Sequence, residues 1–70
     1  MWERIIQSEI VVRQSVLPVR VVLDRDRELG EYRTYLEIIQ TGGEATFLHG
    51  RIFKELSEAQ EDFERRSRRL

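Results

Sequence analysis

The 70-residue chain lacks cysteine altogether and has a single histidine and a single proline. Without cysteine it can form neither a disulfide nor a thiolate metal site, and one imidazole falls short of the set that most zinc sites use. We therefore expect no bound metal and no cofactor. A domain of this length buries only about 60% of the surface of its unfolded chain, so self-association is the remaining source of added stability.

The chain also lacks an excess of charge of either sign and any long apolar run. Twelve Lys and Arg residues against thirteen Asp and Glu residues give a formal net charge of −1, and 40% of the residues are apolar. This balance attracts the chain as a whole to neither nucleic acid nor a membrane surface. Charged residues interrupt the segment 1–9, so this segment lacks the continuous apolar run of a signal peptide or a membrane span. We expect one domain over residues 1–70, located in the cytoplasm.

What the chain does have is a change in the spacing of its apolar residues. Alternating apolar residues, typical of strands, give way to helical spacing within residues 47–63. Strands are predicted at residues 19–24, 32–40 and about 45–53, separated by turns at residues 26–30 and 41–44. The pattern predicts an α+β fold: a four-stranded antiparallel β-meander with one C-terminal α-helix packed on one face.

The N-terminal segment fits more than one structure. We predict the first strand from about Ser8, because the β-branched residues Ile10–Val12 pack well on a sheet, with residues 14–18 as the connection that follows. Residues 1–9 fit a helix, a strand or an arm, since Trp2, Ile5 and Ile6 suit a helical stripe as well.

The helix is predicted from about Leu56 to Arg69. Ser57 and Gln60 have the spacing of a capping box, which would start the helix at Glu58 instead. Arginines gather at its end, and acids one turn earlier, such as Asp62 before Arg66, give them a structural explanation. A nucleic-acid-binding tail is the alternative interpretation.

Alternation within the strands assigns two faces to the sheet. The face expected beneath the helix carries Ile10, Val12, Val19, Val21, Leu23, Thr34, Leu36, Ile38, Leu48, Gly50 and Ile52. Gly50 has no Cβ, so we expect it to let the helix approach closely. The opposite face mixes apolar, aromatic and charged residues: Val11, Arg13, Arg20, Val22, Arg33, Tyr35, Glu37, Ile39, Phe47, His49 and Arg51.

That opposite face has too many apolar groups for a solvated surface, and we predict that a partner covers it. The candidate interaction residues are Arg13, Arg20, Val22, Arg33, Tyr35, Ile39, Phe47, His49 and Arg51. In the favoured interpretation a second copy packs there or extends the edge of the sheet and makes a homodimer, in which the arginines pair with Glu37 and Asp24 at the rim. An unidentified protein partner is also compatible. Single-stranded nucleic acid is the alternative, with bases stacked on the aromatic rings and four arginines holding phosphates.

Catalysis has little support in the sequence. His49 is the one candidate base, oriented by Glu37 or Asp24, but a small sheet with one helix offers little room for a pocket that excludes water. Asp24 and Asp26 lack the continuation of a calcium loop. We predict no catalytic residues, and a non-enzymatic interaction or accessory domain.

Two resemblances accompany these predictions. The motif Y-x-T-x-L at residues 32–36, followed by F-x-H-G-x-x-F-x-x-L-x-x-A-x-x-D-F-x-x-R at residues 47–66, resembles small uncharacterised bacterial proteins. This resemblance covers about half of the chain and implies the strand-to-helix unit but no activity. The order of four strands and a helix also resembles single-stranded-DNA-binding coactivator and purine-rich-element-binding folds, which dimerise and bind through the sheet.

Overall fold

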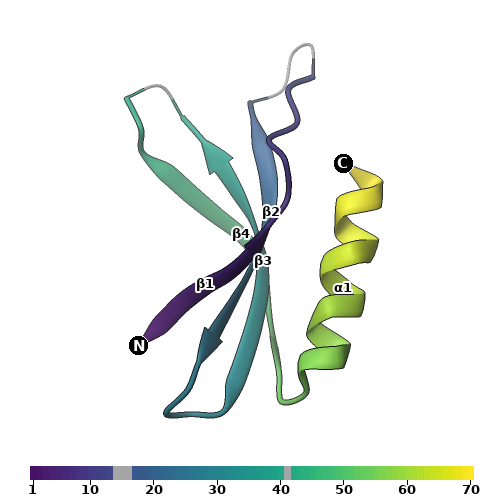
Figure 1. Ribbon diagram of the computed structural model, residues 1–70. Coiled ribbons are helices and arrows are strands. Elements are labelled where there is room, and N and C mark those ends of the chain that lie inside the picture. Colours follow the sequence, from purple (N-terminus) through teal and green to yellow (C-terminus); the bar gives the residue numbers. More distant parts are fainter. Residues whose placement is uncertain (14–16, 41) are drawn as a thin grey trace.

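The computed structural model describes residues 1–13, 17–40 and 42–70, and it confirms the predicted fold class. Four strands form one antiparallel sheet in the order β1-β2-β3-β4, and one helix follows them (Figure 1). The elements are β1 (Trp2–Gln7), β2 (Val19–Asp26), β3 (Glu31–Ile39), β4 (Ala45–Phe53) and α1 (Leu56–Arg69).

The β2–β3 hairpin is the centre of the sheet. Its register is continuous from Val19 opposite Ile38 to Asp26 opposite Glu31. The turn after Asp26 closes at Gly30, whose φ of 64° is a conformation that suits glycine. Since these strands have neighbours on both sides, the largest fully buried side chains, Val21, Val22, Leu23 and Thr34, all belong to them.

The first strand lies earlier than predicted. β1 ends at Gln7, and Ser8 onward is connection, in which Val11 forms only an isolated bridge with Val19. A bulge between Arg4 and Ile6 shifts the register of β1 on β2, so Arg4 and Ile6 lie on opposite faces, whereas residues two apart in a regular strand share a face. Residues 10 and 12, expected beneath the helix, are exposed. Residues 14–16 of the predicted connection and residue 41 of the predicted turn lie outside the described residues.

The helix α1 lies across one face of the sheet and contacts β2, β3 and β4 (Figure 1). Its N-cap is Glu55, which makes no capping hydrogen bond through its side chain, so the predicted capping box is absent and the helix begins at Leu56. Ala59 and Asp62 are its buried residues. The Thr34 hydroxyl donates a hydrogen bond to Asp62 Oδ2, which ties the helix to the centre of the sheet.

Candidate interaction surface

We call the sheet face that carries Arg20, Val22, Arg33 and Tyr35, opposite the helix, the second face. Val22 is 0% exposed and Tyr35 is 5% exposed. The sequence predicted both as part of an uncovered apolar surface, and this prediction is wrong because charged and aromatic side chains of the same chain surround them. The second face is therefore mostly sealed within the monomer.

Glu37 joins two arginines on the second face. Its Oε2 accepts a hydrogen bond from Arg4 Nη2 at 2.6 Å, and its Oε1 accepts one from Arg20 Nε at 2.6 Å. Burial alone would raise the pKa of this carboxyl, but the hydrogen bonds and charges of the two guanidinium groups outweigh burial and hold the pKa below its ordinary value. Arg20 stands directly opposite Glu37 in the β2–β3 register. This arginine is thus engaged within the chain.

Asp24 forms a second buried centre on the same face. Its Oδ2 accepts hydrogen bonds from Arg33 Nε and from the Tyr35 hydroxyl, both at 2.9 Å. The Arg33 guanidinium lies 4.4 Å from the ring centroid of Trp2, and Tyr35 packs edge-to-face on Phe47 with centroids 5.0 Å apart. Burial, and the hydrogen bond to Asp24, raise the pKa of Tyr35. These contacts link all four strands.

The arginines of the second face are balanced by acids. Arg4 and Arg20 pair with Glu37, and Arg33 pairs with Asp24. The alternation in the sequence predicted an excess of arginine on this face, and that excess motivated the nucleic-acid interpretation. Because Arg4, Arg20 and Arg33 pair with acids of the same chain, the excess of positive charge that nucleic-acid binding would need is not present among them.

A β-bulge at His49 and Gly50 interrupts β4. Leu48 pairs with Leu36 and Arg51 pairs with Thr34, so the two residues between them share one opposite position in β3. His49 has a φ of 57°, in the left-handed region that non-glycine residues rarely adopt. Because a bulge adds one residue to its strand, the alternation beyond it is shifted by one, and the side chains there exchange faces.

Because of the bulge, four residues lie on other faces of the sheet than the sequence predicted. Arg51 was expected on the second face, but its Nη1 lies 3.8 Å from Asp62 of the helix. His49 was expected there too, and it lines a cavity of about 310 Å³ on the helix side, between β3 and the end of α1. Ile52 and Gly50 were expected beneath the helix and instead belong to the second face. A Cβ at Gly50 would meet nothing within 4 Å, so close approach of the helix does not explain this glycine.

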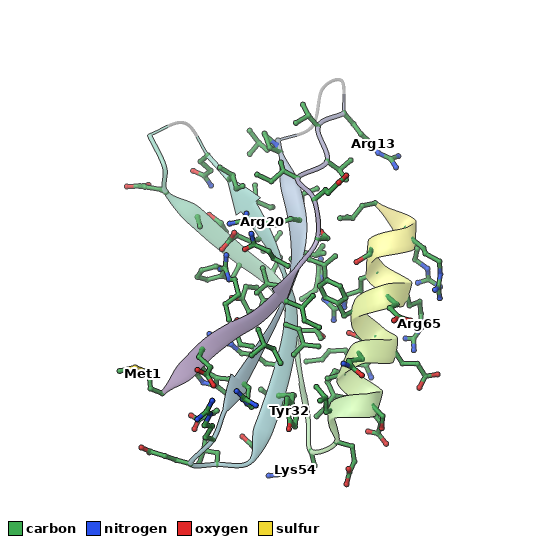
Figure 2. All side chains as sticks on the ribbon, viewed as in Figure 1. Met1, Arg13, Arg20, Tyr32, Lys54 and Arg65 are labelled. Atoms are coloured by element: carbon green, nitrogen blue, oxygen red, sulfur yellow. The ribbon has the colours of Figure 1, made fainter. Side chains whose placement is uncertain are left out.

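The other predicted residues are dispersed. Arg13 lies in the connection before β2 and is exposed, and its side chain extends toward the side on which the helix lies (Figure 2). Ile39 ends β3 opposite Ala45 and is half-buried. The nine candidate residues therefore do not form one surface.

The open surface of the described chain is β4. Every residue of this strand except Phe53 is exposed, and within the described residues β3 is its only neighbouring strand. Phe47 is 57% exposed, Leu48 39% and Ile52 54%. The sequence predicted Phe47 and the sheet edge as possible contacts, but it did not predict Ile52 or say which edge. A signal was present, because the last strand of a meander is an edge strand.

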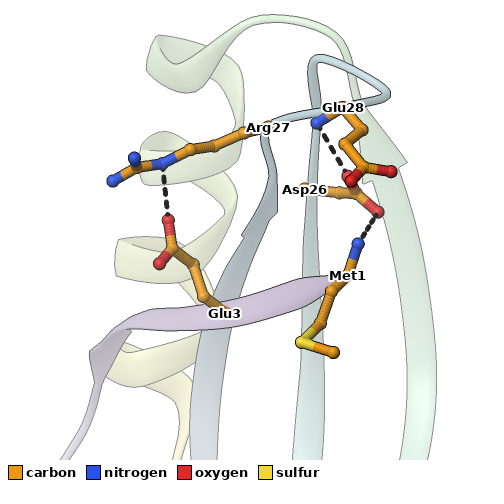
Figure 3. A pocket seen from close by; sticks show the side chains of 5 residues that line it. All are labelled: Met1, Glu3, Asp26, Arg27 and Glu28. Atoms are coloured by element: carbon orange, nitrogen blue, oxygen red, sulfur yellow. Dashed lines mark hydrogen bonds and ion pairs between the residues drawn. The ribbon is translucent and has the colours of Figure 1, made fainter.

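A cavity of about 210 Å³ lies between the start of β1 and the β2–β3 turn (Figure 3). Asp26 Oδ1 accepts hydrogen bonds from the backbone N–H groups of Glu28 and Leu29, and its Oδ2 accepts one from the amino group of Met1. Burial opposes ionisation of Asp26, but these donors hold its pKa below the ordinary value. Asp26 thus stabilises the β2–β3 turn and holds the start of β1 against it.

The catalytic arrangement considered from the sequence is not formed. His49 lies toward the helix side, whereas Glu37 and Asp24 lie on the second face with arginine partners. Among the described residues no group of three or more His, Asp or Glu side chains is placed to hold a metal ion. The same residues include no helix with the length and apolar character needed to cross a bilayer.

Comparison of the chain with protein-family models, with curated proteins and with solved structures finds no match. The resemblance of residues 32–66 to small bacterial proteins therefore stays a prediction.

Proposed function

We propose that this chain is a small, non-enzymatic interaction domain of the cytoplasm that self-associates as a homodimer through β4. The exposure of β4 on both faces and along its outer edge carries the proposal. Edge strands present unpaired N–H and C=O groups that bind another strand, and exposed apolar side chains on a small domain mark contact surfaces. Phe47, Leu48 and Ile52 supply such side chains beside the edge.

The expected affinity is modest. Complete burial of a Phe or Ile side chain contributes about 1.5–3 kcal/mol, and Phe47 and Ile52 are each roughly half exposed. Two such residues from each copy give about 3–6 kcal/mol, to which backbone hydrogen bonds between the strands add. Association costs at least about 4 kcal/mol in lost rigid-body freedom. A micromolar dissociation constant corresponds to about −8 kcal/mol, so the backbone hydrogen bonds between the strands would have to contribute about 6–9 kcal/mol.

Sedimentation velocity at about 1–100 µM tests the proposal, because this range brackets a micromolar dissociation constant. We expect the wild type to shift from the 8.4 kDa monomer to a dimer as the concentration rises. Ile52→Lys places a charge in the contact and should leave a monomer. Leu29→Lys is the matched control, since Leu29 is 60% exposed in the distant β2–β3 turn and its replacement should leave the dimer intact. A wild-type monomer at the highest concentration contradicts the proposal.

Single-stranded nucleic-acid binding is the competing function, and oligonucleotide titration decides it. Held phosphates make affinity fall steeply with salt, by several hundred-fold between about 50 and 200 mM when about five phosphates are bound. We expect no binding even at the lower salt concentration, because Arg20 and Arg33 already pair with buried carboxylates. Salt-dependent binding that is lost in Arg33→Gln would favour the competing function.

A further inference from the structure

We propose that the occupant of the β4 edge is a second copy of β4, antiparallel to the first, with a two-fold axis between His49 and Gly50. This inference rests on the proposed self-association and adds the register of the two strands. It predicts one continuous eight-stranded sheet with a helix from each copy on the same side, since a two-fold axis perpendicular to the sheet preserves its faces.

The bulge allows β4 to pair with a second copy of itself in this register. His49 and Gly50 together stand opposite one residue of β3, so β4 is one residue longer there than a regular strand. In a regular strand, residues an odd number of positions apart lie on opposite faces, so they could not stand opposite each other across a two-fold axis perpendicular to the sheet. A second copy has the same extra residue at the same place. An antiparallel copy centred on the bulge therefore stays in phase on both sides.

The side chains agree with this register. It places Phe47 of each copy opposite Ile52 of the other, and both residues lie on the second face. Residues directly opposite each other in an antiparallel pair share a face, and their Cβ atoms are about 5 Å apart. The two most exposed apolar side chains of β4 thus cover each other twice, once on each side of the axis.

Neighbouring registers fail. Moving the second copy by one residue sets Phe47 opposite Arg51 or Phe53, which lie on the helix side. Moving it by two residues restores the faces but sets Phe47 opposite Gly50 or Lys54, so Phe47 loses its apolar partner. Only the register centred between His49 and Gly50 both matches the faces and sets Phe47 opposite Ile52.

Spin-label distances test the register, and the absence of cysteine lets each single substitution carry the only label. Ala45 and Lys54 are both exposed and lie equally far from the proposed axis, one on each side. Labels at Ala45→Cys and at Lys54→Cys should each give an intermolecular distance of about 30 Å, since nine residues of strand at about 3.3 Å separate the paired labels along the sheet. Each labelled variant is also sedimented, which confirms that it still dimerises.

The equality of the two distances is the decisive result. A shift of the register by two residues would lengthen one distance by about 7 Å and shorten the other by as much. Unequal distances, or two distances far above 30 Å, in a protein that sediments as a dimer would overturn this register and leave the proposed function standing. A wild-type protein that sediments as a monomer would overturn both. Adding Ile52→Lys to either labelled variant should abolish the dipolar signal.

Discussion

Replacing Glu37 with Gln removes the negative charge from the buried centre of the second face while keeping the size of the side chain. In the wild type the carboxylate accepts bonds from Arg4 and Arg20, each at 2.6 Å. The amide of Gln has one acceptor oxygen, and its NH2 group would face the other guanidinium as a second donor. We expect Glu37→Gln to lower the free energy of unfolding.

The magnitude follows from burial. Removing one partner of a fully buried ion pair costs about 3–5 kcal/mol. The Glu37 side chain is 5% exposed, but those of Arg4 and Arg20 are 34% and 20% exposed, so water retains part of their hydration. We therefore expect a loss of about 2 kcal/mol. For a domain of this size, that loss lowers Tm by about 8–16 °C.

The pH dependence gives a sharper test. The pKa of Glu37 is lower in the folded protein than in the unfolded chain, so the ion pairs contribute their stability above the unfolded value and lose it as the pH falls through the folded value. The difference between wild type and Glu37→Gln should be full at pH 7 and should shrink below about pH 4. Protonation makes the wild-type side chain neutral, as the amide already is.

Urea denaturation monitored by circular dichroism, at one fixed protein concentration, measures both effects. Glu44→Gln is the matched control, because Glu44 is exposed in the β3–β4 turn and no ion pair of the described residues includes it. This control should unfold like the wild type. If Glu37→Gln is as stable as the control at pH 7, or if its deficit persists unchanged at pH 3, the ion-pair argument is wrong.

Two further substitutions test the helix contact and the bulge, with Thr46→Val as a common control on an exposed position of β4. Thr34→Val removes the buried hydroxyl that donates to Asp62 and should lower the free energy of unfolding by about 1.5–3 kcal/mol in urea denaturation, the range for hydrogen bonds to charged groups, whereas the control should change it little. His49→Val should destabilise the protein by about 1–2 kcal/mol because a β-branched residue fits the left-handed conformation poorly, although strand propensity predicts the opposite sign; a stabilised variant would show that the bulge is not formed.

The sequence predicts the regular parts of this fold because each regular element has a consistent local period. β3 runs over residues 31–39 against a predicted 32–40, and β4 and α1 match their predicted ranges. The first strand was predicted too late in the chain because the bulge after Arg4 breaks the alternation of apolar residues that would have indicated β1. Strong local β-propensity at residues 10–12 then pointed to the wrong segment, where the chain makes only a bridge at Val11.

The exchange of faces in β4 had a signal that was assigned to the wrong cause. A single glycine inside a strand indicates either a bulge or a close approach of backbone. Close approach was predicted for Gly50, whereas the structure has a bulge there with His49 in the left-handed position. The choice depends on how β3 and β4 pair, which alternation in one strand does not contain. His49, Arg51 and Ile52 were therefore placed on the wrong faces.

The ion pairs of the second face were within reach of the sequence. A hairpin closed by the turn at residues 26–30 sets Arg20 opposite Glu37 and Asp24 opposite Arg33, as the structure has them. Opposite charges at directly facing positions of an antiparallel pair attract each other. The pairing with Glu37 and Asp24 was predicted at the rim of a dimer contact, whereas the structure has it within one chain, so the count of four arginines against two acids made the face seem basic. The contribution of Arg4 was beyond reach, because it required the correct position of β1.

The separation of paired charges from open apolar groups decides where a partner binds. A ligand that covers the second face must compete with bonds that Glu37 already accepts from two arginines, and breaking them leaves buried charge unpaired. A strand added to β4 breaks no ion pair of the second face and covers Ile52. The two regions should therefore respond independently: Glu37→Gln should lower the free energy of unfolding of the monomer, and Ile52→Lys should abolish dimerisation. Positions 37 and 52 share no ion pair, so the double variant should show both losses in full, and strong non-additivity would show that the dimer contact depends on the ion pairs of Glu37.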